Sequence, residues 1–304
     1  MRIFTCVPWS RAAFDLPGPY NPARMELGFF DRTARGRLIV TGRDRTDLLH
    51  RLATNSLLEL TPTQGVATCF TTNKGRLIDF TVVLDRGEDL LLLSGNPERL
   101  SGHIQQFTIT EDVTVRNYMA IELIVCGPRA AELLGVELEP WQFTERALAD
   151  VTVQIVRVEP LAGDAYTVLA PDAVALRRLL AEQGQLLTQD DVTALRVRDA
   201  IPAFPNEINE RHNPWEARLH EYVSSTKGCY IGQEVIARLN TYDKVQRKLT
   251  KLSLARPFED GDVLYGKDGT EVGEVTTVAG SDALGYVKVA LLVPGTELDG
   301  ATVR

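Results

Sequence analysis

The sequence contains no long apolar run. Across its 304 residues, no window offers the roughly 18 uninterrupted apolar residues that a membrane helix needs, and the richest run, Leu90 to Leu93, has only the length of a strand. We therefore expect a soluble protein with no membrane association.

Cysteines and histidines with metal-site or disulfide spacing are also lacking. The four cysteines, Cys6, Cys69, Cys126 and Cys229, form no C-x-x-C pair, which argues against a disulfide framework and against a metal knuckle. Of the four histidines, His212 and His220 are eight residues apart, whereas metal-binding pairs on a helix are usually closer. The pattern predicts free thiols and no metal site.

A surplus of basic residues is absent as well, since 33 Lys and Arg face 41 Asp and Glu for a formal charge of −8. Nucleic acid attracts proteins through cations that meet its phosphates. The basic stretch Lys244 to Lys251 offers a local contact for RNA or an acidic partner, but a solvated face is the favoured interpretation. We expect no direct binding to nucleic acid, and a monomer.

The first residues, Met1 to Pro22, carry arginines and prolines instead of the apolar segment of a secretory signal. We expect residence in the cytoplasm. Residues 1–25 are predicted to be an N-terminal extension, and a chain that begins at Met25 is predicted to fold as stably as the longer one.

Strand and helix patterns alternate without a regular β-α-β order, which predicts an α+β fold. Apolar positions at helical spacing follow Arg43, and a strand-length run from Leu77 to Leu84 is answered by Leu90 to Leu93, as in a hairpin. After Tyr242 only short strands separated by turns remain. They predict a small β-barrel over residues 244–304, joined to residues 26–243 by a linker at Thr241 to Lys244.

An eight-residue motif, K-G-C-Y-I-G-Q-E, carries the most specific signal in the chain. It consists of Lys227, Gly228, Cys229, Tyr230, Ile231, Gly232, Gln233 and Glu234. The motif resembles the signature octapeptide of the YgfZ-like folate-binding family, which is related to the glycine-cleavage T protein. Further similar segments are L-G-F-F-D-R-T-A-R-G-R-L-I-V-T-G-R-D from Leu27, T-N-K-G-R-L-I-D from Thr72, C-G-P-R-A from Cys126 and L-R-V-R-D-A-I-P from Leu195.

The resemblance implies two intertwined α+β domains, within residues 26–243, around a central opening, closed by the C-terminal β-barrel. It implies tetrahydrofolate or a one-carbon derivative as the ligand of that opening. It also implies iron–sulfur enzymes or their assembly proteins as partners, and through them an indirect role in tRNA modification. The T protein itself is an aminomethyltransferase, which is the alternative function.

Cys229 is the candidate reactive thiol. It precedes a predicted helix, Gly232 to Leu239, whose positive end stabilises a thiolate, and Lys227 adds a nearby cation. The alternative is a small residue packed beneath the helix. We predict that Cys229 is alkylated faster than the other three cysteines, because Cys69 and Cys126 lie in apolar strand runs.

Asp79 is the candidate catalytic and folate-binding carboxylate. By the resemblance it occupies an acidic position at which the T protein reads D-D, with Phe80 in place of the second acid. It would accept a hydrogen bond from the pterin or move a proton. The alternatives are a cap of a turn and an ion pair with Arg76.

A carboxylate that pairs with the pterin is expected from the family motif L-R-x-E-A-G, but Arg198 stands where that motif has Glu. Asp199 is the predicted substitute and Glu207 the second choice, while a salt-bridged Asp199 on a helix face is an equal alternative. Because a step of one residue turns a helical side chain by about 100°, the substitution changes the direction of the acid.

Further cofactor contacts are predicted at four polar residues, Asn73, Lys74, Arg76 and Arg196, which could orient the anionic tail of a folate. Solvated surface is the alternative for each. The octapeptide and the loss of the second acid at Phe80 favour a folate-binding accessory protein over a transferase, so we expect a protein that is not an enzyme.

Overall fold

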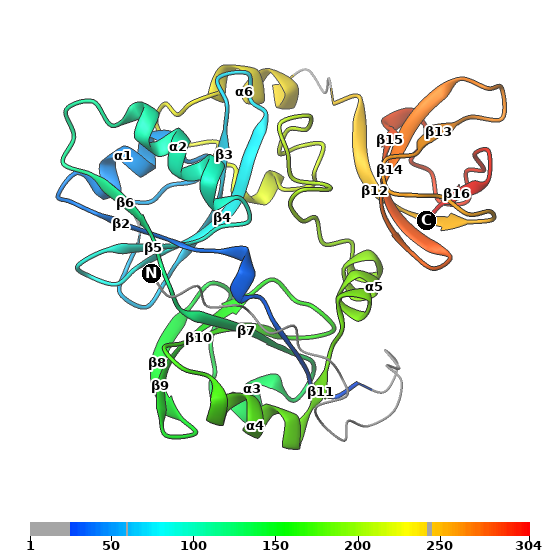
Figure 1. Ribbon diagram of the computed structural model, residues 1–304. Coiled ribbons are helices and arrows are strands. Elements are labelled where there is room, and N and C mark those ends of the chain that lie inside the picture. The colour runs from blue at the N-terminus through cyan, green and yellow to red at the C-terminus, as the bar shows by residue number, and fades with distance from the viewer. Residues whose placement is uncertain (1–24, 59, 242–244) are drawn as a thin grey trace, which may run out of the picture.

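The computed structural model describes residues 25–58, 60–241 and 245–304. Three sheets form the molecule, and two of them are interleaved along the chain (Figure 1). Of the predicted N-terminal extension, only Met25 falls within the described residues, and of the predicted linker only Thr241. The predicted domain boundaries at these two places stay predictions.

The first sheet has six strands in the order β11-β1-β7-β10-β9-β8. The strands are β1 (Gly28–Asp31), β7 (Ile121–Cys126), β8 (Phe143–Leu148), β9 (Val151–Val158), β10 (Ala165–Ala170) and β11 (Gln185–Leu186). Neighbours pair antiparallel except β1 with β11. Helices α3 (Ala130–Leu134) and α4 (Val174–Gln183) place leucines such as Leu134 and Leu180 in the core of this sheet.

The second sheet has five antiparallel strands in the order β3-β4-β5-β2-β6. They are β2 (Leu38–Thr41), β3 (Val66–Thr71), β4 (Leu77–Asp85), β5 (Leu90–Leu93) and β6 (Thr114–Asn117). Helices α1 (Arg45–Leu52) and α2 (Pro97–Phe107) pack their apolar faces on it. All five strands lie between β1 and β7 in the chain, so the second sheet interrupts the first, as an intertwined fold requires.

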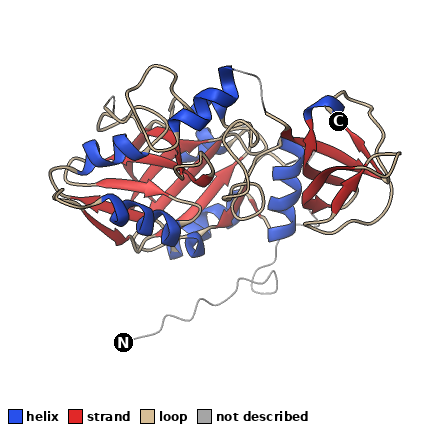
Figure 2. Cartoon of the chain, turned by 90° about the horizontal axis from the view of Figure 1, so that it is seen from above, coloured by secondary structure: helices blue, strands red, loops and turns tan. Residues whose placement is uncertain are grey.

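The C-terminal sheet has the order β13-β14-β15-β12-β16. Its strands are β12 (Arg247–Leu254), β13 (Val263–Tyr265), β14 (Glu271–Ala279), β15 (Asp282–Lys288) and β16 (Ala301–Val303). Asp299, just before β16, donates a backbone hydrogen bond of 2.9 Å to the carbonyl of Tyr265 in β13, so the two ends of the strand order approach each other. The sheet therefore has the form of a half-barrel. Helix α5 (Gln189–Asp199) packs against β14 and β15 and stands between this sheet and the rest of the chain (Figure 2).

The α+β fold, with two intertwined parts and a C-terminal barrel-like sheet, is confirmed. Within the described ranges, no helix has the length and apolar character that would let it cross a membrane.

Candidate functional site

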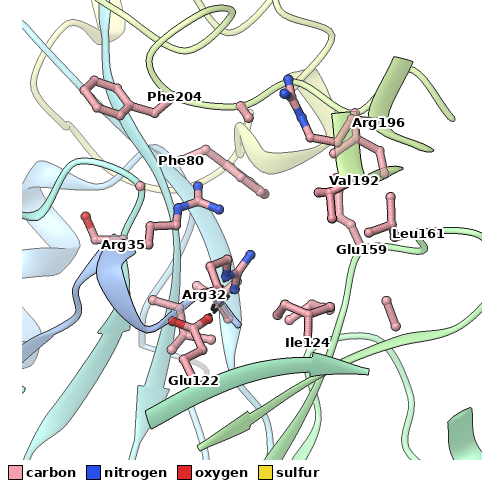
Figure 3. A pocket seen from close by; sticks show the side chains of 18 of the residues that line it. Arg32, Arg35, Phe80, Glu122, Ile124, Glu159, Leu161, Val192, Arg196 and Phe204 are labelled. Carbon is pink, nitrogen blue, oxygen red and sulfur yellow. Dashed lines mark hydrogen bonds and ion pairs between the residues drawn. The ribbon is translucent and has the colours of Figure 1, made fainter. Parts of the chain in front are cut away.

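A cavity of about 740 Å³ opens between the first two sheets and the start of the segment that leads to the C-terminal sheet. Its walls come from strands of both sheets and from α5 (Figure 3). A volume of this size suits a small organic molecule, since most ligand pockets hold about 300 to 1,000 Å³. The interleaving of the sheets therefore creates a site to which distant parts of the chain contribute.

One wall carries a buried cluster of two arginines and one glutamate. Glu122 of β7 is only 2 % exposed and accepts hydrogen bonds from Arg32 at 2.5 and 2.8 Å and from Arg37 at 2.6 Å. Arg37 also donates to the carbonyl of Ala120. Because two guanidinium groups share one carboxylate, this wall keeps an excess of positive charge.

Arg35 adds a third cation to the cavity. It ends a short 3-10 helix (Thr33–Arg35) between β1 and β2, and its side chain enters the cavity (Figure 3). Burial and the neighbouring Arg32 lower the pKa of Arg35 to about 10. Among the described residues, nothing accepts a hydrogen bond from its guanidinium, which is therefore available to an oxygen of a ligand.

Gly95 makes room for this guanidinium. A Cβ at position 95 would lie 2.6 Å from an Arg35 nitrogen and 3.3 Å from the Cβ of Phe204. Any side chain here would displace the arginine from the cavity wall.

Aromatic rings form the apolar part of the lining. Phe80 of β4 lies 6.4 Å from Trp141 in an edge-to-face arrangement and 4.7 Å from the ring of Tyr222, measured between ring centroids. Phe204 lines another part of the wall (Figure 3). Flat apolar surfaces of this kind are suited to an aromatic heterocycle.

The predicted catalytic acid Asp79 stands behind the wall. Successive side chains of a strand point to opposite faces, and in β4 Phe80 and Val82 line the cavity whereas Asp79 is fully buried. Its carboxyl oxygens accept hydrogen bonds from Thr81 at 2.8 Å, from Ser94 at 2.5 Å and from the backbone of Gly95. Burial raises the pKa of Asp79. The alternative pair with Arg76 does not form, because Arg76 pairs with Glu216 instead.

Asp199 and Arg198 lie at the end of α5, beside a second cavity of about 460 Å³ and outside the lining of the first. Asp199 accepts two hydrogen bonds from Arg198, at 2.7 and 2.8 Å, and one from the backbone of Ala162. The structure thus has the salt-bridged helix residue that was the alternative to a pterin contact.

Glu207 is fully buried and anchors the cavity wall without lining it. It accepts hydrogen bonds from Arg196 and from Thr277 of β14, both at 2.5 Å, and from the backbone of Ala203 at 2.9 Å. Arg196, by contrast, lines the cavity from α5, and its predicted contact with the cofactor stays a prediction.

The predicted contacts Asn73, Lys74 and Arg76 lie in the turn between β3 and β4, away from the residues that line the cavity. Arg76 donates to the carbonyl of Arg211 at 2.8 Å. Phe80 was recognised only as a missing acid. The lining residues that were not predicted at all include Arg32, Arg35, Glu122 and Glu159. The two arginines stand inside a quoted family-like segment, which was the available signal.

Glu159 follows the end of β9 and lines the central cavity, the second cavity beside Asp199 and a further cavity of about 460 Å³ beside Tyr222. The hydroxyl of Tyr222, at the end of a 3-10 helix (His220–Tyr222), donates a short hydrogen bond to its Oε1. Burial raises the pKa of Glu159. No local motif distinguishes this residue in the sequence.

The octapeptide packs on the turn between β3 and β4, so two family-like segments meet. Thr71 donates to the carbonyl of Ile231 at 2.8 Å, and a Cβ on Gly232, whose φ is +85°, would lie 2.5 Å from the carbonyl oxygen of Thr72. Only glycine suits this position. The rest of the octapeptide leads into α6 (Gln233–Thr241), where Glu234 pairs with Arg238.

Lys227 caps the C-terminal end of helix α1. Its ammonium donates to the carbonyls of His50 at 2.5 Å, Ala53 at 2.6 Å and Asn55 at 3.2 Å, and burial lowers its pKa to about 8. These three acceptors account for its hydrogens. Lys227 is thus a cap of helix α1 in the structure, and its predicted role as a cation near Cys229 stays a prediction.

Cys229 is exposed, and no octapeptide residue lines the three cavities, as far as the described residues show. Cys69 and Cys126 are buried, and burial raises the pKa of Cys126 to about 12. The faster alkylation of Cys229 stays a prediction, and its exposure supports it. Cys6 lies outside the described residues. In the part of the chain that the structure describes, no cluster of His, Cys, Asp and Glu could hold a metal ion.

Comparison with known families shows which family this chain belongs to. The family described as the GCVT N-terminal domain matches residues 20–227, more than half of the chain. The chain belongs to this family. This GCVT-type chain is also similar in fold to a solved glycine cleavage system aminomethyltransferase T from Bartonella henselae, with a TM-score of 0.82 at 21 % identity over 93 % of this chain and 86 % of that one.

Relatives of this GCVT-type chain include a putative chloroplastic transferase of Arabidopsis thaliana. It is 29 % identical over 83 % of this chain and 63 % of its own length, so the chain spans less than two thirds of that relative. An aminomethyltransferase of Moorella thermoacetica is 29 % identical over 91 % of this chain and 81 % of its own length.

Proposed function

We propose that the cavity between the first two sheets binds tetrahydrofolate or a one-carbon derivative. One observation carries the proposal: the cavity combines the guanidinium of Arg35, which has no hydrogen-bond acceptor among the described residues, with the aromatic walls of Phe80, Trp141 and Phe204. A reduced folate offers a flat heterocycle, a benzoyl ring, and carbonyl and carboxylate oxygens. The residues fit these groups, since rings stack on rings and a guanidinium binds oxygens strongly. Relatives named aminomethyltransferases support the same class of ligand.

We further propose that the protein is an accessory factor for iron–sulfur enzymes, as in the YgfZ-like branch. Phe80 points into the cavity where the T protein is expected to have an acid, and the neighbouring Asp79 is enclosed behind the wall. A transferase needs its proton-moving group at the reacting carbon. The exposed Cys229 in the octapeptide would then act on a partner protein outside the cavity.

Ligand binding is tested by thermal unfolding of the purified protein with tetrahydrofolate. A ligand at a hundredfold excess over its Kd stabilises the folded state by about 2.7 kcal/mol, so we expect a clear rise in Tm. Arg35→Met should reduce the rise, because it removes the free guanidinium. Arg43→Met is the matched control, since the Arg43 side chain is 81 % exposed. Absence of any rise in the native protein would contradict the proposal.

The aminomethyltransferase alternative is separated from the accessory role by two measurements. The native protein is expected to show no transfer of an aminomethyl-derived carbon to tetrahydrofolate. In cells that lack the protein, the native chain should restore iron–sulfur enzyme activity and Cys229→Ser should not. Transfer at an enzymatic rate, with full rescue by Cys229→Ser, would favour the alternative.

A further inference from the structure

The carboxylates around the cavity differ in their partners. Asp31 pairs with Arg177, and Glu122 is held by two arginines. Glu98 is exposed at the rim. Glu159 is the exception, because among the described residues its one hydrogen-bond partner is the hydroxyl of Tyr222 and no cation pairs with it.

We propose that Glu159, positioned by Tyr222, is the residue that recognises the heterocycle of the ligand by accepting two adjacent N–H groups. The inference rests on the proposed function and adds a specificity. It assigns the site to heterocycles of the 2-amino-4-oxopyrimidine type, which present a ring N–H beside an amino group.

The geometry supplies the right acceptors. Tyr222 engages Oε1 of Glu159, which leaves Oε2 and a second lone pair on Oε1 for a ligand. A carboxylate accepts two parallel N–H donors more strongly than neutral groups do. Arg198, the penultimate residue of α5, cannot take this role, because a guanidinium has no acceptor.

The aromatic side chains around Glu159 provide a flat surface that suits a heterocycle. The ring of Tyr222 is in contact with Phe80 and lies edge-on to Trp141, 5.8 Å away, and both of these rings line the cavity beside Glu159. A heterocycle bonded to Glu159 would thus meet an aromatic wall. Figure 3 shows that Glu159 and Arg35 enter the cavity from different walls, so one ligand can engage both.

The energetics favour a role in binding over a role in stability. A carboxylate removed from water without a cation costs folding free energy. Such a group is common at functional sites, where a ligand supplies the missing donors.

The first test is a titration of the native protein, Glu159→Gln and Glu221→Gln with tetrahydrofolate. Glu221 is an exposed neighbour of Tyr222 that does not line the central cavity, so it is the matched control. The loss of a charge-assisted pair should raise the Kd of Glu159→Gln roughly ten- to a hundredfold, and Glu221→Gln should stay within about twofold of the native value. An unchanged Kd in folded Glu159→Gln would overturn the inference.

The deciding arm of the second test uses the native protein and so does not depend on how a variant folds. Pterin and lumazine compete with tetrahydrofolate, and lumazine has a 2-oxo group in place of the 2-amino donor. The inhibition constant of pterin should be at least about tenfold lower than that of lumazine. The 2-oxo oxygen of lumazine would face a carboxylate oxygen of Glu159, and no hydrogen lies between these two acceptors. The amide of Glu159→Gln can donate to the 2-oxo oxygen, so this variant should show a smaller difference in affinity between pterin and lumazine. Equal competition by the two compounds overturns the inference.

The outcomes distinguish this inference from the proposed function. If the native protein does not bind tetrahydrofolate, both are wrong. If it binds and neither test shows a dependence on Glu159, the proposed function stands and this inference is wrong.

Discussion

Glu159 is partly buried in the cavity wall, and this burial raises its pKa. The folded chain therefore takes up a proton at this residue more readily than the unfolded chain does. Its contribution to stability is fully present below the unfolded pKa and is lost as the pH rises through the higher folded pKa. In the ligand-free protein at neutral pH, the charged Glu159 weakens the fold.

A prediction at the residue scale follows for Glu159→Gln, which cannot ionise. In the absence of ligand, its Tm should equal that of the native protein near pH 4 and exceed it increasingly as the pH approaches 7. Thermal unfolding followed by circular dichroism across this range measures the difference. A native protein that is the more stable of the two at pH 7 would show that the charge supports the fold.

Single residues of the site were predicted only where a motif marked them. Arg196 lies in a quoted segment and lines the cavity, and Phe80, which directly follows another quoted segment, lines it too. Asp79 lies in one too, but successive side chains of a strand alternate between faces. Phe80 and Val82 therefore line the cavity, while Asp79 is buried and accepts hydrogen bonds from Ser94 and Gly95. Glu159 could not be predicted from the sequence, because its hydrogen-bond partner Tyr222 and the other residues of the cavity wall lie far from it in the chain.

At the scale of elements, the C-terminal end of helix α1 is capped by Lys227, which is distant from this helix in the sequence. The last carbonyls of a helix lack partners within it and carry partial negative charge. The ammonium of Lys227 supplies both hydrogens and charge to this end.

Lys227→Met should therefore destabilise the protein by about 2 kcal/mol, the loss expected when hydrogen bonds from a charged group are removed. The measurement is the urea midpoint at pH 7, where the native ammonium, with a pKa of about 8, is still mainly protonated. Lys74→Met is the control, because Lys74 is exposed in the adjacent turn and should have little effect. Equal midpoints for the two variants would contradict the capping role.

Elements with strong periodicity were predicted well and weakly patterned ones were missed. The apolar positions at helical spacing after Arg43 form helix α1 in the structure. Strand β8, F-T-E-R-A-L, was not predicted, because it lies at the edge of its sheet and most of its side chains meet water. An edge strand of this kind has no apolar alternation to mark it.

At the scale of the whole molecule, Glu207 joins the parts. Its carboxylate holds Arg196 of the cavity wall and Thr277 of the C-terminal sheet, and its carbonyl accepts from the hydroxyl of Tyr286 at 2.7 Å. A single buried side chain thus links the cavity to the half-barrel.

Glu207→Ala should lower the free energy of unfolding by about 3 kcal/mol or more, because removal of one partner leaves a charge uncompensated. It should also weaken tetrahydrofolate binding, as the released Arg196 no longer keeps its place in the wall. Urea unfolding and titration measure the two effects. Glu210→Ala is the control, since Glu210 makes an exposed pair with Arg99 and should cost less than about 1 kcal/mol.

The arrangement of the sheets was predicted only through the family resemblance. Periodicity identifies strands but does not say that β1 will pair with β7 across the whole second sheet, because that pairing joins residues about ninety positions apart. The α+β class follows from local patterns, while the central cavity follows from long-range pairing.

The exposure of Cys229 also makes the protein a convenient starting point for a sensor. In a Cys6→Ser chain, Cys229 would be the accessible thiol, because Cys69 and Cys126 are buried. A maleimide dye would attach there without further engineering. The labelled segment begins just after Tyr222, whose hydroxyl meets Glu159 in the cavity. Fluorescence of such a dye would follow the arrival of ligand in real time, so the protein could report folate levels optically.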